Sequence, residues 1–163
     1  MPASVLIDTG FLIALANPAD PQHESAREYW KYFKTEEMLI YLSAIVVSEF
    51  EIVQKIPDDI LKACVMLPFN YADGVRAAQY DWTRDKPEGV QRDAMKDDIK
   101  IIAQAAGAGV DYVITRDPNS FVKYCEALRA KGHTKFRIIN LAEGFDMSHF
   151  EGGQTSMFNV GGE

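Results

Sequence analysis

Short apolar runs alternate with helical segments along this chain, and two of these runs end beside an aspartate. Residues 4–7 (Ser-Val-Leu-Ile) lead directly into Asp8, and residues 112–115 (Tyr-Val-Ile-Thr) lead into Arg116 and Asp117. Extended and helical segments that alternate in this way favour a mainly parallel sheet, because successive strands are then joined by helices. The chain is therefore expected to form an α/β domain.

Turn residues and helix caps place the other elements. Ser43 is a good N-cap, and Pro57 restricts the residue before it to extended backbone, so one helix is expected between them. Pro57 suits the start of the next helix, whose apolar stripe runs to Val65. In full, helices are predicted at residues 9–16, 23–34, 43–55, 57–65, 73–82, 97–108 and from Pro118 onward, and strands at 4–7, 39–42, 112–115 and 136–139.

The length of the chain suits a single domain. With 163 residues, of which 47% are hydrophobic, it can bury a sizeable core. We expect this domain at residues 1–145, with a charged surface excursion at about residues 81–97. The Gly-rich tail at residues 146–163 is expected to be flexible.

The sequence predicts neither secretion nor membrane insertion. The apolar stretch at residues 11–16 is too short to cross a bilayer, and no basic region precedes it. Cys64 and Cys125 lie far apart and form no metal-type pair, which suits reduced thiols better than a disulfide. We therefore expect a cytoplasmic protein.

Glu49 falls where a surface acid is not expected. On the predicted helix its neighbours three and four positions away are all apolar: Ile45, Val46, Ile52 and Val53. Glu51 has polar neighbours instead and is expected to be solvated. A carboxylate on an apolar face needs a cation or a hydrogen-bond donor, unless it lies at the rim of the face and reaches water.

The adjacent acids Asp97 and Asp98 separate in the same way. Asp98 shares its helix face with three apolar residues, Ile101, Ile102 and Ala105. Asp97 shares its face with two polar residues, Lys100 and Gln104. Asp98 is thus the inward member of the pair, although the helix dipole also favours an acid in the first helical turn.

Asp8 and Asp117 each follow a predicted strand and precede a predicted helix. Each of them can be a simple N-cap. In open α/β sheets, however, ligands bind outside the carboxyl ends of the strands, where both acids are placed. Two strand-end acids and two inward helical acids at one sheet edge repel one another unless a cation binds them. Mg²⁺ or Mn²⁺ suits such oxygen ligands and can activate water for attack on a phosphate.

Four fragments stand in a particular order along the chain. They are residues 5–9 (Val-Leu-Ile-Asp-Thr), Ser48 with Glu49, Asp98 with Ile101, Ala103 and Ala105, and residues 113–117 (Val-Ile-Thr-Arg-Asp). This order resembles the PIN-domain nucleases, and the toxins of the VapC type are the nearest in size. The resemblance spans residues 4–140. It implies a three-layer α/β/α sandwich. It also implies that the protein hydrolyses RNA phosphodiester bonds with one or two Mg²⁺ or Mn²⁺ ions, which four acids hold.

Transferred by position, the resemblance assigns roles to eight residues. Asp8, Glu49 and Asp98 are the expected main metal ligands, and Asp117 is expected to complete the site directly or through water. The hydroxyls of Thr9 and Thr115 are expected to orient ligands or phosphate. Asn119 and Ser120 are weaker candidates, because polar residues at a helix start are usually caps. The resemblance further implies a homodimer, an RNA substrate and a small antitoxin protein as partner.

Other interpretations stay open. A chain with this fold can be a catalytically silent module that binds RNA or protein. A phosphatase with an aspartyl nucleophile needs a second Asp two residues after the first, where this chain has Gly10. Asp8-Thr9-Gly10 is also the aspartic-protease tripeptide, but a helix at residues 11–16 does not suit a β-rich protease. In the charged excursion, four residues either contact RNA or face solvent: Trp82, Arg84, Lys86 and Arg92.

The acidic balance limits nonspecific binding to nucleic acid. With 17 Lys and Arg against 24 Asp and Glu, the formal net charge is −7, so the protein as a whole does not attract a polyanion. Each divalent ion held by the acids adds two positive charges where a phosphate would dock. RNA binding is therefore expected to depend on the metal site and on substrate shape.

Overall fold

The computed structural model describes residues 1–80, 92–117 and 119–151. In this part of the chain, five strands form one sheet in the order β3-β2-β1-β4-β5, and every neighbouring pair is parallel. The strands are β1 (Ser4–Ile7), β2 (Leu39–Ser43), β3 (Cys64–Leu67), β4 (Tyr112–Thr115) and β5 (Arg137–Asn140). The predicted parallel sheet is confirmed.

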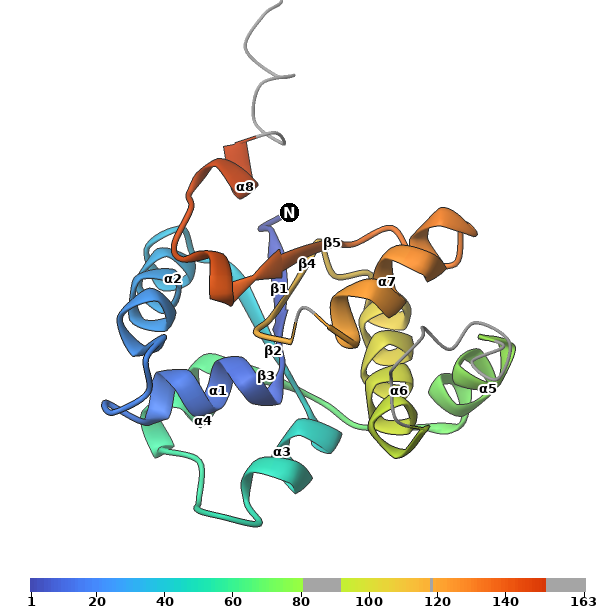
Figure 1. The fold of residues 1–163 in the computed structure, drawn as a ribbon, viewed down its shortest axis with the longest axis horizontal. Helices are drawn as coiled ribbons and strands as arrows, with labels where there is room; N and C mark the ends of the chain where they lie inside the picture. Colours follow the sequence, from blue (N-terminus) through green and yellow to red (C-terminus); the bar gives the residue numbers. More distant parts are fainter. Residues whose placement is uncertain (81–91, 118, 152–163) are drawn as a thin grey trace, which may run out of the picture.

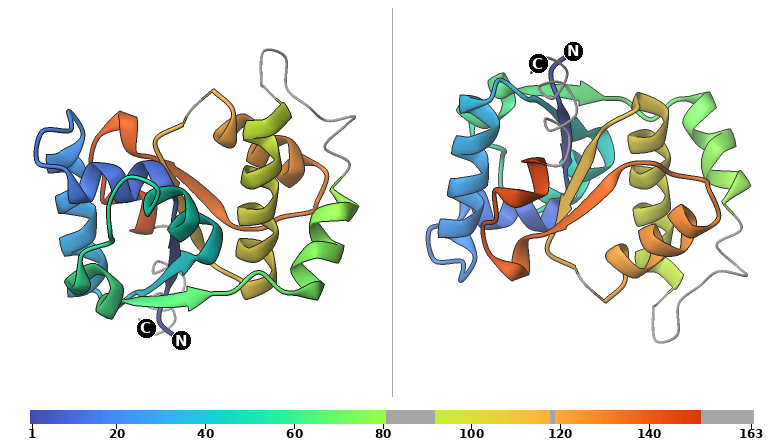
Figure 2. Two further views of the ribbon diagram at one scale, coloured as in Figure 1. Left: turned by 90° about the horizontal axis from the view of Figure 1, so that it is seen from below. Right: turned by 90° about the horizontal axis from the view of Figure 1, so that it is seen from above.

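Helices cover both faces of the sheet. They are α1 (Thr9–Ala16), α2 (His23–Thr35), α3 (Ala44–Phe50), α4 (Asp58–Ala63), α5 (Tyr71–Gln79), α6 (Arg92–Ala108), α7 (Phe121–Ala130) and α8 (Ser148–Glu151), with a 3-10 turn, η1 (Leu141–Glu143). α1 and α2 lie on one side of the sheet, and α6 and α7 lie on the other (Figure 1). The views from below and above show the same separation (Figure 2). The predicted three-layer α/β/α sandwich is therefore confirmed.

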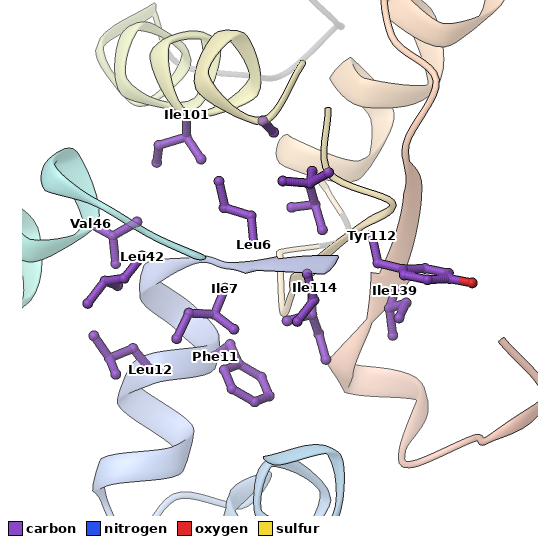
Figure 3. Close-up of a cluster of buried hydrophobic side chains, with 14 of the residues drawn as sticks. Leu6, Ile7, Phe11, Leu12, Leu42, Val46, Ile101, Tyr112, Ile114 and Ile139 are labelled. Atoms are coloured by element: carbon purple, nitrogen blue, oxygen red, sulfur yellow. The ribbon is translucent and has the colours of Figure 1, made fainter. Parts of the chain in front are cut away.

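β1 forms the middle of the core. Successive side chains of a strand point to opposite faces, so Leu6 faces Ile101 of α6, whereas Ile7 faces α1 beside Phe11 (Figure 3). Val5, Leu6 and Ile7 are all fully buried. Helix α1 begins one residue after the strand, at Thr9 as predicted, so the chain turns sharply at the carboxyl end of β1.

α3 is shorter than the helix predicted from Ser43 to residue 55. Ser43 caps it as expected, because its Oγ accepts a hydrogen bond from a backbone N–H of the first turn at 3.0 Å. The helix ends at Phe50, and the chain then turns, which leaves Ile52 and Val53 83% and 86% exposed. Two β-branched residues with nothing to pack against do not extend a helix. The apolar helix face predicted for them is therefore wrong.

A strand takes the place of the end of the next predicted helix. α4 ends at Ala63, and β3 follows directly, although the apolar stripe predicted a helix through Val65. β3 pairs with β2, from Ile40 opposite Cys64 to Ser43 opposite Leu67. In a short apolar run, the spacing of apolar residues does not distinguish a strand from a helix. Pairing with a strand distant in sequence decides its conformation here.

The charged excursion is shorter than predicted. α6 begins at Arg92, so residues 92–97 form its first turns and not part of a loop. This segment (Arg-Asp-Ala-Met-Lys-Asp) contains mostly good helix formers and no proline, so it extends the helix. Residues 81–91 lie outside the described part of the chain, and with them three of the residues considered for RNA contact: Trp82, Arg84 and Lys86.

The described residues also bear on the predictions about membrane spans and cysteines. The described helices include none with the length and apolar character needed to cross a lipid bilayer. Cys64 and Cys125 are both free thiols. Cys125 is buried in α7, and burial raises its pKa well above the ordinary value, so it remains a protonated core residue.

The segment predicted to be a flexible tail from residue 146 begins with an ordered helix. Phe150 of α8 is only 9% exposed. Its ring stacks on Tyr32, with the centroids 4.6 Å apart, and packs edge-to-face with the ring of Tyr112, with the centroids 4.9 Å apart. An aromatic side chain that buries this much apolar surface fixes a short helix that has little stability alone. The prediction was wrong for residues 148–151, and residues 152–163 lie outside the described part.

Phe150→Ala is expected to lower the free energy of unfolding by about 3 kcal/mol, because it empties an aromatic pocket between α2 and β4. Urea unfolding followed by circular dichroism measures the change. Met147→Ala is the control, since Met147 is exposed and its truncation should cost less than about 0.5 kcal/mol. Equal stability of the two variants would mean that α8 does not contribute to the core.

Candidate acidic active site

The carboxyl ends of β1 and β4 place two acids at the same edge of the sheet. Asp8 follows β1, and its backbone N–H donates to the carbonyl of Ile114 in β4 at 3.2 Å. Its side chain caps α1 by accepting a hydrogen bond from the N–H of Phe11 at 3.0 Å. Asp117 lies two residues beyond the end of β4. β1 and β4 are adjacent parallel strands, so both acids occupy the position where α/β sheets bind ligands.

α3 and α6 bring two further acids to this edge. Glu49 lies on α3, which packs against both α1 and α6, and Asp98 lies on α6. Together with Asp8 and Asp117 they line one cavity of about 220 Å³. The other lining residues are Thr9, Gly10, Ile101, Arg116 and Phe121. The structure thus brings together all four acids that the sequence singles out.

Glu49 lines the cavity although two of its four predicted apolar neighbours, Ile52 and Val53, lie beyond the end of α3. Ile45 and Val46, on the preceding turn of α3, are half-buried and buried, and they suffice to turn Glu49 inward. The hydroxyl of Thr9 donates a hydrogen bond to the Glu49 carboxylate. Glu51 is exposed, as predicted.

The adjacent acids of α6 divide as predicted. The side chain of Asp97 is 46% exposed and pairs with Lys100 at 3.4 Å, whereas Asp98 is partly buried and lines the cavity. Because α6 begins at Arg92, Asp98 lies beyond the first turn, so the helix dipole does not explain its position. Gln104, expected on the polar face, is buried instead.

The carboxyl groups of Asp98 and Asp8 both have raised pKa values. Burial raises the pKa of Asp98 to about 8, and the charges of Asp8, Asp117 and Glu49 add to this effect. Burial likewise raises the pKa of Asp8 to about 6, although hydrogen bonds from Thr115 and from the N–H of Phe11 oppose it. Burial is the larger cause of both shifts, and the repulsion among the neighbouring carboxylates is the part that a bound cation would relieve.

Asp117 differs from Asp8 and Asp98 because the residues that follow it in the chain donate hydrogen bonds to its carboxylate. Burial raises the pKa of Asp117, but hydrogen bonds from the hydroxyl and the N–H of Ser120 and from the N–H of Asn119 outweigh this effect, so the pKa lies below its ordinary value. Pro118 lies outside the described residues, and α7 begins at Phe121 and not at Pro118 as predicted. The observed contacts of Asn119 and Ser120 are those of a turn that positions Asp117.

The two predicted hydroxyl residues each contact an acid of the cavity. Thr9 binds Glu49, and Thr115 is fully buried and hydrogen-bonded to Asp8. The Thr115 hydroxyl also accepts a hydrogen bond from the backbone N–H of Asp117 at 3.1 Å. One hydroxyl therefore connects the strand-end acids of β1 and β4 and fixes their relative position.

Gln104 fixes the distance between α6 and the first half of the sheet. Its side-chain oxygen accepts from the Ser43 hydroxyl at 2.5 Å, and its side-chain N–H donates to the carbonyl of Leu67 at 3.1 Å. Gln104→Leu is expected to cost about 2 kcal/mol in chemical unfolding, because the buried Ser43 hydroxyl and the Leu67 carbonyl lose their partners. Lys100→Leu, one turn earlier at a partly exposed position, should change stability by less than about 0.5 kcal/mol. A Gln104→Leu protein as stable as the control would rule out this role.

The donor set suits a hard divalent cation. The four carboxyl groups and the Thr9 hydroxyl that line the cavity offer oxygen atoms, which is the ligand type of Mg²⁺ and Mn²⁺. Within residues 1–80, 92–117 and 119–151, no three Asp, Glu, His or Cys side chains lie close enough together to hold a metal ion in the observed conformation. The role of the four acids as ligands therefore remains a prediction, which rests on their chemistry and on their convergence.

The cavity also contains a cation that the sequence pattern did not reveal. Arg116 lines it beside Asp117, and its Nη1 donates to Asp20 at 2.5 Å. Asp20 lies in the turn between α1 and α2, almost a hundred residues earlier in the chain, so no local pattern connects the two. The only sequence signal is Gly10, which stands in a helix where a residue with a side chain is preferred.

No protein-family model and no curated protein matches this chain. Solved structures do match. The FitAcB structure from Neisseria gonorrhoeae contains a chain with a TM-score of 0.60 and 20% identity, over 85% of this chain and 98% of that one. A chain of VapBC2 from Rickettsia felis, bound to a promoter DNA fragment, gives a TM-score of 0.57 and 13% identity, over 84% and 98%.

A third match is VapC20 from Mycobacterium tuberculosis, a toxin that cleaves the sarcin-ricin loop. Its TM-score is 0.55 at 16% identity, over 76% of this chain and 94% of that one. Identities this low establish likeness of fold. The chain therefore has the fold of the PIN-domain, VapC-type proteins that its sequence resembles.

Proposed function

We propose that this protein is a metal-dependent endoribonuclease and the toxin of a toxin–antitoxin pair. The observation that carries this proposal is the convergence of Asp8, Glu49, Asp98 and Asp117 on one cavity at the carboxyl edge of a parallel sheet. Two of these carboxyls have pKa values raised by burial and by their neighbours' charge, as in a site built for a cation. The likeness of fold to a toxin that cleaves the sarcin-ricin loop supports RNA as the substrate.

The four acids would hold one or two Mg²⁺ or Mn²⁺ ions, with Asp8, Glu49 and Asp98 as the main ligands. When bound, the ion supplies the positive charge that stabilises the phosphorane-like transition state and helps water to attack phosphorus. The protein's own contribution is to place these carboxylates. Thr115 holds Asp8 toward Asp117, and Thr9 orients Glu49. Asp98 must lose the proton that it retains at neutral pH before it can serve as a ligand.

An antitoxin is the expected protein partner. The matched structures from Rickettsia felis and Salmonella typhimurium are VapBC assemblies bound to DNA, and the Neisseria gonorrhoeae match is FitAcB. By analogy, we infer that a small DNA-binding protein encoded beside this chain controls it. We place the pair in the cytoplasm with the RNA substrate, and we infer a homodimer from the resemblance alone.

Glu49→Gln tests the proposed function with a neighbour as its matched control. Glutamine can still accept the hydrogen bond from Thr9, so the fold should persist, but one charged ligand is lost. Cleavage of a labelled RNA with Mn²⁺ is expected to fall about a hundredfold or more. Glu51→Gln makes the same chemical change at an exposed position and should cleave like the wild type.

The outcomes separate the nuclease from the silent binding module. Cleavage that persists in Glu49→Gln would mean that these are not the catalytic acids. A wild-type protein that binds Mn²⁺ or RNA but cleaves neither structured nor single-stranded RNA would favour the silent module.

A further inference from the structure

Arg116 is the one residue with a basic side chain that lines the acidic cavity, among those the structure describes. It lies between Thr115 and Asp117, and its side chain is 30% exposed, so it remains accessible to a ligand. A guanidinium beside four carboxylates would be expected to pair with one of them. Instead, within the described part of the chain, its hydrogen bond goes to Asp20.

Asp20 is fixed independently of Arg116. One oxygen of its carboxylate accepts from the backbone N–H of Gln22 at 2.9 Å, and the other accepts from Arg116. The backbone of Asp20 is also tied into the α1–α2 turn, since its N–H donates to the carbonyl of Asn17 at 3.0 Å. The Asp20 side chain is only 8% exposed. Asp20 is therefore a rigid anchor, and Arg116 is the group that it holds.

Gly10 provides the space for this arrangement. A Cβ atom at residue 10 would lie 2.6 Å from Cγ of Arg116 and 3.3 Å from its Cδ, so the arginine stem rests directly on the backbone of α1. A glycine near the start of a helix, a buried carboxylate and an arginine, from three separate elements, together set the position of one guanidinium. Such an arrangement holds Arg116 in a specific place beside the site.

We propose that Arg116 is a phosphate-binding residue in the lining of the acidic cavity, and that Asp20 holds its guanidinium away from the carboxylates so that they stay available to a cation. This inference rests on the proposed nuclease function and adds to it a residue that contacts substrate. A guanidinium has five N–H donors in a planar fork that matches a phosphate, and Nη1 alone is engaged by Asp20. Arg116 would thus bind a backbone phosphate of RNA beside the cleaved bond.

The first test measures cation binding without cleavage. Half-saturation by Mn²⁺ is measured from thermal unfolding of the wild type, Asp20→Asn, Arg116→Met and the double variant. Without its anchor, Arg116 is expected to turn onto the carboxylates, so Asp20→Asn should need about tenfold more Mn²⁺. The double variant should return to the Mn²⁺ requirement of Arg116→Met, since the competing cation is gone. An unchanged requirement in a folded Asp20→Asn protein overturns the holding role.

The second test measures RNA binding in an inactive background. With Asp98→Asn, fluorescence anisotropy of a labelled RNA gives the affinity at several salt concentrations. Adding Arg116→Met should weaken binding about tenfold and reduce the salt dependence by about one phosphate contact. Arg116→Lys should recover part of the affinity, because it keeps the charge but not the fork. Arg129→Met removes the same charge from an exposed position on α7 and should bind as the background protein does.

The two proposals fail in different ways. If the wild type cleaves RNA and Arg116→Met binds it as tightly as Arg129→Met does, the phosphate-binding role is overturned and the nuclease function stands. If the wild type neither binds nor cleaves RNA, the proposed function and this inference are both overturned. Weaker RNA binding by Arg116→Met alone, together with the changed Mn²⁺ requirement of Asp20→Asn, supports the inference.

Discussion

Asp98→Asn is expected to stabilise the metal-free protein at pH 8 and to abolish RNA cleavage. The Asp98 carboxyl is partly buried beside three other acids, which raises its pKa to about 8. In the unfolded chain the same group ionises near pH 4, so folding must either keep its proton or bury its charge. Asparagine removes this cost. Allowing for partial solvent screening, we expect a gain of about 2 kcal/mol, or about 4–8 °C in the melting temperature.

The gain in stability should disappear in acid. Below about pH 4, Asp98 is neutral in both the folded and the unfolded state, so asparagine no longer relieves an electrostatic cost. Thermal unfolding in a chelator at pH 4 and pH 8 measures the difference. A destabilised Asp98→Asn protein at pH 8 would mean that the carboxyl makes favourable contacts that the neighbouring charges do not outweigh.

The same variant should lose RNA cleavage by about a hundredfold or more, because a ligand of the proposed cation is gone. Asp97→Asn is the matched control. Its carboxylate is 46% exposed and pairs with Lys100, so the change should alter stability by less than about 0.5 kcal/mol and cleavage by less than about twofold. Equal loss of cleavage in both variants would contradict the assignment of Asp98 as the inward acid.

A rise in stability paired with a loss of activity would distinguish a functional acid from a structural one. A carboxylate that stabilises the fold, such as Asp20 with Arg116, should show the opposite change when it is neutralised. A group of acids around one cavity is expected to lower the free energy of unfolding. Such acids are retained only where function requires them.

Local signals predicted the strand-end acids well. Asp8 ends an apolar run and starts a helix, and both boundaries depend on a few adjacent residues: the strand Ser4–Ile7, the cap and the helix Thr9–Ala16. Asp98 was identified by its apolar neighbours on one helix, which is also local information. For Glu49 the neighbours on the preceding turn were informative, whereas those after Phe50 were not on the helix at all.

Contacts between distant segments were not predictable in this way. β3 is a strand because β2 offers it hydrogen bonds, and Phe150 is buried because Tyr32 and Tyr112 form its pocket. The Arg116–Asp20 pair also joins distant segments. Each of these depends on the assembled sheet, and none leaves a periodic pattern in the sequence.

Mn²⁺ is expected to reverse the pH dependence of stability. In the metal-free protein, Asp98 and Asp8 bind protons more tightly when folded, with pKa values of about 8 and 6. The stability that these carboxyls provide is fully present below about pH 4 and is lost as the pH rises through 6 and then 8. Asp117 and Asp20 have lowered pKa values, so their contribution is lost only as the pH falls below about 4. Between pH 4 and pH 8 the metal-free protein should therefore become less stable.

Saturating Mn²⁺ should change the sign of the dependence of stability on pH, because the cation competes with protons for the same carboxylate oxygens. Binding to the folded state stabilises it by about 3 kcal/mol at a hundredfold excess over the dissociation constant, and affinity rises as Asp98 and then Asp8 lose their protons. The rise in melting temperature on adding Mn²⁺ should thus be small at pH 6 and largest at pH 8. Differential scanning calorimetry at matched ionic strength gives both slopes, with Glu51→Gln as a control that behaves like the wild type. The same Mn²⁺ effect at both pH values, or none at pH 8, would contradict cation binding by these acids, because their mutual repulsion is what the cation is expected to relieve.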